Sequence, residues 1–389
     1  MAVLFTGAAA LNTAIVGATT VSTLIASDAK GDGWSGIPNA AVVAGTALGA
    51  LYLGVLIGKK GQRTSLILVY SLAVAGGLLA FLGGVLASLT VLLPGLVLLG
   101  IGNGAAGLVR YTAAELFPAN RKAFALSIIV WAGTIGAIAG PALLAPAAAS
   151  ARFFGLPEWS GAIGFAALLS AIAMVASMTM PRAAFPAVGP QRPPLTLARV
   201  LAALRRRTVL VPLVSMAAAH VTMVAVMTMT PLQLHHQGHG LDVVGFVLSA
   251  HMIGMFALAP LSGKIADRVG GRATIIAGVG VLVLAAVTVV AAPTAHTTGL
   301  PLALFLLGYG WNLVFVGSSA LLSRDLADDE RTQLQGVIDA LVWSASGLGG
   351  IIAGGLFGLG GYALVAVVAA VLALTPLALV AQRNRGRHD

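Results

Sequence analysis

The sequence predicts an all-α membrane protein of twelve transmembrane helices, built as two six-helix halves with both termini in the cytoplasm. Three observations predict this class. The 389-residue chain is 58% hydrophobic and only 9% charged, whereas soluble domains carry about 25% charged residues. Its apolar segments are about 20 residues long, which is the length that crosses a bilayer. Its basic residues gather in the connections on one side of the membrane, which is the positive-inside pattern.

The first half, residues 1–180, contains six apolar segments. The first of them lacks a basic flank and a small-residue cleavage site, so we expect a retained span rather than a signal peptide. Basic residues occupy tight turns after the second and fourth spans, and a longer connection with Arg152 precedes the sixth. The expected spans are 3–26, 36–58, 64–87, 91–113, 123–145 and 160–180.

Residues 181–207 form the one long polar break in the chain, with five prolines and six arginines. A structureless segment of this length is unusual inside a compact unit, so we interpret it as a basic, Pro-rich cytoplasmic linker between the halves. The second half, residues 208–389, again contains six apolar segments. The expected spans are 208–231, 243–262, 273–292, 300–323, 333–356 and 361–381.

Strict alternation of these spans places nineteen of the 22 basic residues on one side. Only Lys30 and Arg152 fall on the other side, and Arg110 lies inside a span. The charge bias therefore predicts cytoplasmic termini in a multi-pass protein of the cell membrane. It also explains the net charge of +10 without a nucleic-acid partner. We expect a monomer in the lipid bilayer.

A ten-residue pattern occurs twice, 209 residues apart, once after the second span of each half. Both copies fit G-x-[LI]-x-x-[KR]-x-G-x-R, in which the glycines permit a tight turn and the basic residues hold it on the cytoplasmic side. The candidate gate residues in these loops are Gly54, Gly58, Lys59 and Arg63 in the first copy, and Gly263, Asp267, Arg268, Gly270 and Arg272 in the second.

This double loop motif resembles the major facilitator superfamily, and the resemblance extends over essentially the whole chain. It implies two six-helix halves related as a parallel repeat and transport by alternating access. In that family, the acidic residue of the motif helps to lock the cytoplasmic gate. Asp267 stands at that place in the second copy, but Gly58 replaces it in the first.

The fifth span carries Gly136, Gly140 and Pro141, which resemble the glycine-proline motif of drug–proton antiporters. The same small-xxx-small spacing also lets helices approach closely in lipid, and both interpretations stay open. Besides histidine, only Arg110 and Asp339 are ionisable residues inside the spans. Such residues are candidates for function, as gate ion pairs or as proton carriers, although snorkelling to the interface also explains them. No nucleophile–base pair or acidic dyad indicates an enzyme.

Six of the ten methionines and five of the seven histidines lie between residues 216 and 255, in a chain without cysteine. At about 100° per residue, four of them share one face of the seventh span and two share a face of the eighth. Thioether and imidazole groups suit Cu(I). A single methionine in an apolar span is usually packing, but two facing stripes favour a path for a soft metal. The residues are Met216, His220, Met223, Met227, His251 and Met255.

With a rise of about 1.5 Å per residue in antiparallel spans, His251 should lie level with Met223, and Met255 level with His220. We predict Met223, Met227, His251 and Met255 as primary ligands, with His220 and Met216 on the exit side. The external loop carries three further histidines that could collect a metal, although a merely solvated loop is an equal alternative. They are His235, His236 and His239.

Met223-x3-Met227 and His251-x3-Met255 resemble the paired motifs of the CcoA-like copper importers (the CalT group), over residues 216–262. The resemblance implies copper uptake, with copper as the transported substrate and no cofactor. The alternative is efflux or antiport of a small organic compound or drug, with the methionines as a flexible apolar lining.

Overall fold

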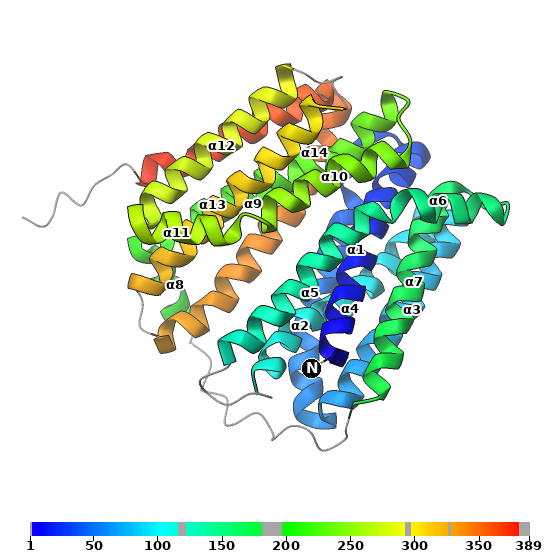
Figure 1. The fold of residues 1–389 in the computed structure, drawn as a ribbon, viewed down its shortest axis with the longest axis horizontal. Coiled ribbons are helices and arrows are strands. Elements are labelled where there is room, and N and C mark those ends of the chain that lie inside the picture. The colour runs from blue at the N-terminus through cyan, green and yellow to red at the C-terminus, as the bar shows by residue number, and fades with distance from the viewer. Residues whose placement is uncertain (1, 116–121, 181–196, 292–296, 326–327, 381–389) are drawn as a thin grey trace, which may run out of the picture. The chain divides into compact units, whose positions relative to one another are not determined.

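The computed structural model describes residues 2–115, 122–180, 197–291, 297–325 and 328–380. Within these ranges all regular secondary structure is helical (Figure 1). Among the described residues, eight helical segments are long and apolar enough to cross a membrane, and a bent pair, Trp131–Ala142 with Leu144–Phe153, makes a ninth candidate. The prediction of a multi-pass helical membrane protein is therefore confirmed.

The helices of the N-terminal part agree with the predicted spans to within a few residues. Glycines let some of them touch backbone to backbone: a Cβ at Gly45 would lie 2.0 Å from the carbonyl oxygen of Val97. Small residues permit such contact between membrane helices. The elements are α1 (Ala2–Lys30), the 3-10 helix η1 (Asp32–Trp34), α2 (Ile37–Lys60), α3 (Gln62–Val85), α4 (Leu89–Glu115), α5 (Lys122–Ala142), α6 (Leu144–Phe153) and α7 (Glu158–Met178).

The connection that was expected between the fifth and sixth spans is partly helical. Helix α6 continues from α5 after a bend of 49°, and it contains Arg152. The alanine-rich sequence explains the helix. Pro146 in its first turn explains the bend, because proline has no N–H for the carbonyl of Ala142 and its ring clashes with that carbonyl. Arg152 forms an exposed ion pair with Glu158 at the start of α7, at 2.8 Å.

The second part of the chain begins with a short helix inside the predicted linker. Helix α8 (Leu197–Arg205) consists largely of Leu, Ala and Arg, which are strong helix formers, so the linker is not structureless throughout. The elements that follow are α9 (Arg207–His236), α10 (Leu241–Phe256), α11 (Ala259–Val269), α12 (Gly271–Ala291), α13 (Gly299–Asp325) and α14 (Asp328–Val380).

The second part of the chain differs from the predicted spans in two places. The span predicted at 243–262 is divided into α10 and α11, and the last two predicted spans are joined in α14. The backbone of α14 is non-helical at Gly360 and Gly361, which lie at the predicted boundary between those spans. Gly361 has a φ of 66°, a conformation that glycine adopts without steric cost.

The chain divides into two compact units. One comprises Met1–Pro190 with Pro231–Ser249, and the other comprises Gln191–Thr230 with Ala250–Asp389. All six residues of the predicted Met/His path belong to the second unit, whereas the outer ends of α9 and α10 belong to the first.

Candidate functional site

The predicted ligands on α9 and α10 lie in the interior of the second unit. His251 has no exposed surface, and Met223, Met255, His220 and Met216 are also buried. Met227 is half-buried. Five of the six side chains are therefore enclosed by protein, and Met227 is partly enclosed.

Helix α13 fixes the orientation of His251. The imidazole Nδ1 lies 2.9 Å from the backbone carbonyl oxygen of Leu304. A carbonyl oxygen only accepts hydrogen bonds, so Nδ1 carries the proton and Nε2 carries the lone pair. Nε2 is buried and has no hydrogen-bond partner. His251 therefore presents an unused imidazole lone pair inside an apolar helix pair.

The next turn of α10 is held by the same face of α13. Asn312 donates a hydrogen bond from Nδ2 to the carbonyl oxygen of Met255, at 2.7 Å. Between these contacts, a Cβ at Gly308 would lie 2.4 Å from the carbonyl oxygen of His251 and 3.1 Å from Cγ of Met255. The backbones of α10 and α13 thus touch, and the His251–Met255 turn is held rigidly.

His220 on α9 has a different environment. Its Nδ1 accepts a hydrogen bond from the indole nitrogen of Trp311, at 2.9 Å. Its ring packs edge-on against Trp311 and Trp343, with centroid distances of 5.6 and 4.7 Å. Because an indole nitrogen only donates, the proton of neutral His220 is on Nε2. In this arrangement His220 has no free lone pair for a metal.

Met216, predicted on the exit side, belongs to a hydrophobic cluster of α8, α9, α13 and α14. Among its members are Val209, Leu322, Leu334 and Ile338. An apolar methionine in such surroundings acts as packing. Its role as an exit-side contact stays a prediction.

The two buried histidines contact α13 at separate levels. Leu304 and Trp311 are seven residues apart, which is almost two full turns, so they share a face at a separation of about 10 Å along the axis. His251 and His220 therefore contact α13 at different levels. Because Trp311 uses the Nδ1 lone pair of His220, the two imidazoles do not form one coordination sphere in this arrangement.

A conventional metal site with carboxylate ligands is absent from the part of the chain that the structure describes. Within the residues that the structure describes, no three His, Asp or Glu side chains come together as a metal-binding group. Any metal at His251 would therefore depend on the thioethers of α9 and α10, as Cu(I) allows.

The two loop motifs adopt the same backbone conformation. Gly61 has φ 75° and ψ 165°, and Gly270, at the matching position of the second copy, has φ 83° and ψ 156°. This region is accessible essentially to glycine alone. A hydroxyl group in the first turn of the next helix donates a hydrogen bond to the glycine carbonyl in both copies. Ser65 Oγ donates to Gly61 at 2.6 Å, and Thr274 Oγ1 donates to Gly270 at 3.0 Å. The repeat seen in the sequence is thus a repeat of structure.

The predicted gate residues lie at helix ends. In the first copy, Gly54 and Gly58 are in α2, Lys59 is exposed at its end, and Arg63 in α3 donates to the carbonyl oxygen of Met178 at 2.6 Å. Arg63 therefore caps α7. In the second copy, Gly263, Asp267 and Arg268 are in α11, and Arg272 is in the first turn of α12.

Asp267 is exposed, and no ion pair within the described part of the chain involves it. Its role in locking the cytoplasmic gate stays a prediction. Asp339 is half-buried in α14. Arg110 lies in α4, and its side chain is outside the described residues.

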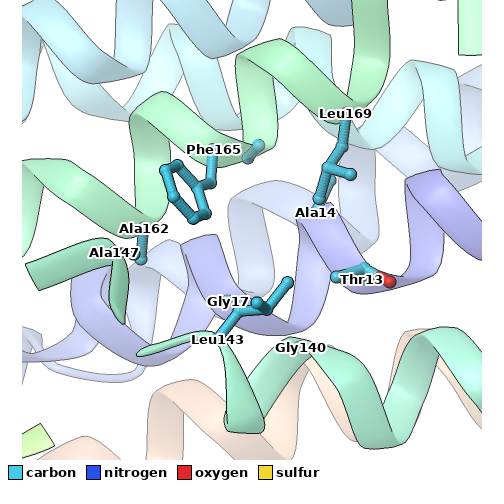
Figure 2. Close-up of a pocket in the computed structure, with 10 residues that line it drawn as sticks. Thr13, Ala14, Gly17, Gly140, Leu143, Ala147, Ala162, Phe165 and Leu169 are labelled. Atoms are coloured by element: carbon cyan, nitrogen blue, oxygen red, sulfur yellow. The ribbon is translucent and has the colours of Figure 1, made fainter. Parts of the chain in front are cut away.

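The glycine motif of the fifth span packs α5 against α1. A Cβ at Gly136 would lie 2.4 Å from the carbonyl oxygen of Ala9, and a Cβ at Gly140 would lie 2.8 Å from Cβ of Val16. Beside them, Thr13 and Leu169 help to line a small cavity between α1, α5, α6 and α7 (Figure 2), with a volume of about 10 Å³. Such a cavity holds at most about one water. These contacts favour the packing interpretation of the motif.

The external histidines face acidic residues of the first unit. Nε2 of His235 lies 3.8 Å from Oδ1 of Asp28, and Nε2 of His236 lies 3.4 Å from Oδ1 of Asp32. The His235 ring also packs edge-on against Trp159, at 5.0 Å. The proposed collection of metal by these histidines stays a prediction.

Sequence reasoning missed the contribution of α13. Trp311, Asn312, Gly308 and the carbonyl of Leu304 hold both histidine-bearing helices, yet none was singled out. A signal was present, because Asn312 is a polar residue inside an apolar span, and such residues are rarely incidental.

Comparisons with known proteins agree with the architecture. The sequence profile of the Major Facilitator Superfamily matches residues 2–350 and 243–387. The uncharacterised MFS-type transporter YdeG of Bacillus subtilis (strain 168) is 29% identical over 386 residues, covering 95% of this chain and 87% of that protein. The riboflavin transporter RfnT of Brucella anthropi is 24% identical over 315 residues, covering 80% and 77%.

Solved structures show the same fold at low sequence identity. The nucleoside transporter NupG superposes with a TM-score of 0.73 at 16% identity, over 97% of this chain and 99% of that one. The D-xylose-proton symporter gives a TM-score of 0.71 at 15% identity, over 96% and 95%. From its sequence profile and its relatives, the chain belongs to the Major Facilitator Superfamily of secondary transporters.

Proposed function

We propose that this transporter imports copper, as Cu(I), across the cytoplasmic membrane, like the CcoA-like group that its Met/His motifs resemble. One observation carries the proposal: Nε2 of His251 is buried without a hydrogen-bond partner, while the Leu304 carbonyl holds Nδ1. Histidines that bind metals usually donate their other ring N–H to such a group, which fixes the tautomer and orients the ring.

The neighbouring ligand candidates suit a soft, singly charged ion. Met255 follows His251 by one turn on α10, and Met223 and Met227 lie one turn apart on α9. These groups are neutral, so they line an apolar interior at a smaller desolvation cost than carboxylates. Hard cations such as Mg²⁺ and Ca²⁺ prefer oxygen ligands, whereas thioethers select Cu(I).

The proposed topology has twelve crossings and cytoplasmic termini. Each of α1 to α4, α7, α9, α12 and α13 makes one crossing. The pairs α5 with α6 and α10 with α11 make one each, and α14 makes two, separated at Gly360. The positive-inside distribution of Lys and Arg supports this orientation. An inside-negative potential then favours entry of a monovalent cation by about 2.3 kcal/mol per 100 mV.

A second candidate is transport of a small organic compound. The similarity to a riboflavin transporter over 80% of this chain favours it, since that relative carries a planar aromatic molecule. On this alternative the methionines would be a flexible apolar lining, and Nε2 of His251 would accept a hydrogen bond from the compound.

Uptake into membrane vesicles distinguishes the two candidates. Vesicles that contain the protein are given Cu(I) under reducing conditions, or riboflavin, and the accumulated amounts are measured against vesicles that contain His251→Gln. Copper uptake that depends on His251, with no riboflavin uptake, supports the proposal. Riboflavin uptake without copper uptake would replace it with the second candidate.

A further inference from the structure

The hydrogen bond between His220 on α9 and Trp311 on α13 does not fit the predicted role of His220 as a copper ligand. His220 lies on the same stripe of α9 as Met223 and is buried, so position alone makes it a second imidazole ligand. Its Nδ1, however, accepts the indole N–H of Trp311 at 2.9 Å. A neutral imidazole has one lone pair on its ring nitrogens, and here that lone pair is used.

The other ring nitrogen of His220 is equally informative. Nε2 is buried and has no hydrogen-bond partner, and Trp343 covers the ring edge-on at 4.7 Å. The bond from Trp311 makes this nitrogen an N–H donor, which repels a cation. His251 shows the opposite arrangement, since the carbonyl of Leu304 makes its buried Nε2 a lone pair. Two partners on α13 thus give two buried histidines opposite tautomers.

We propose that Trp311 is a specificity-determining residue that withholds His220 from the metal by occupying its lone pair. This inference rests on the proposed copper function. With His220 withheld, an ion leaving His251 meets no second free imidazole lone pair where His220 contacts Trp311. Imidazole also binds zinc and divalent copper well, so withholding it keeps the path rich in thioether and selective for Cu(I).

The test removes the indole N–H while keeping an aromatic ring. In Trp311→Phe the lone pair of His220 is released, and the purified protein should bind an additional Cu(I) ion and gain affinity for Zn(II). The matched control is Trp343→Phe, which also removes an indole against His220, but one that donates no hydrogen bond to it. The control should bind metals as the unaltered protein does. Adding His220→Gln to Trp311→Phe should abolish the gain.

A second measurement addresses the tautomers directly and requires no metal. In protein labelled with ¹⁵N-histidine, the ring shifts of His220 should report a proton on Nε2, and those of His251 a proton on Nδ1. Assignment uses the spectra of His220→Gln and His251→Gln. Because the unaltered chain is measured, the test holds even if Trp311→Phe fails to accumulate.

The outcomes separate the two proposals. Unaltered protein that binds no Cu(I) through His251 contradicts the copper function, and the selectivity role of Trp311 with it. Copper binding through His251, with no additional ion in Trp311→Phe, overturns only the role of Trp311. A proton on Nδ1 of His220 overturns that role as well. Opposite tautomers together with the additional ion in Trp311→Phe support it.

Discussion

Nδ1 of His251 donates a hydrogen bond to the carbonyl oxygen of Leu304, at 2.9 Å. The lone pair of this imidazole is therefore on Nε2, which is buried and has no hydrogen-bond partner. This relationship between α10 and α13 is the basis of the first prediction. His251→Gln should reduce copper uptake by at least roughly 100-fold, because loss even of a second-shell partner of a metal ligand costs 10–100-fold. Uptake of Cu(I) into vesicles measures the effect, with the amount of folded protein as the control. Near-normal uptake would exclude His251 as a ligand.

Met223 and Met216, two of the buried methionines of α9, provide a matched pair for the second prediction. Met223→Leu keeps the side-chain volume and removes the sulfur. The free energy of unfolding should therefore change by less than about 1.5 kcal/mol, while copper uptake falls severely. Met216→Leu should leave both nearly unchanged, because Met216 packs in an apolar cluster. Equal loss of uptake in the two variants would make Met216 a ligand after all, as its place on the stripe predicts.

The third prediction concerns the repeated loops. Gly61→Ala and Gly270→Ala should each lower the melting temperature of the purified protein, because φ values of 75° and 83° cost an alanine about 1–3 kcal/mol. Gly263→Ala is the control: nothing lies within 4 Å of a Cβ there, and alanine is the better helix former by about 1 kcal/mol. Equal melting temperatures in all three variants would show that the loops relax freely.

The fourth prediction tests the packing of α5 on α1. Gly136→Ala should destabilise the protein, because its Cβ would lie 2.4 Å from the backbone oxygen of Ala9, and backbone does not move aside cheaply. Gly133→Ala, one turn earlier, should be tolerated, since its Cβ would lie 3.5 Å from Asn12. Thermal unfolding in detergent measures both. A Gly136→Ala protein that is as stable as the unaltered one, yet transports poorly, would favour the antiporter-motif interpretation.

Much of the fold follows from the sequence because the membrane limits the choices. Only helices satisfy their own backbone hydrogen bonds in lipid, so each long apolar segment predicts a helix, and α1, α3, α7, α9, α12 and α13 agree closely with the predicted spans. Interruptions were harder to predict. The sequence predicts connections where α6 and α8 lie, because prolines and charged residues stand beside or among the helix-forming residues of these segments.

The sequence by itself determined which residues share a helix face, because the 3.6-residue period of a helix places Met216, His220, Met223 and Met227 on one stripe whatever packs against them. It also determined the two loop repeats, whose glycine conformations are local. Only the tertiary structure decided what each histidine does. Their partners, Leu304 and Trp311, are 53 and 91 residues away along the chain. A carbonyl oxygen accepts and an indole N–H donates, so packing against α13 gives one imidazole a free lone pair and leaves the other without one.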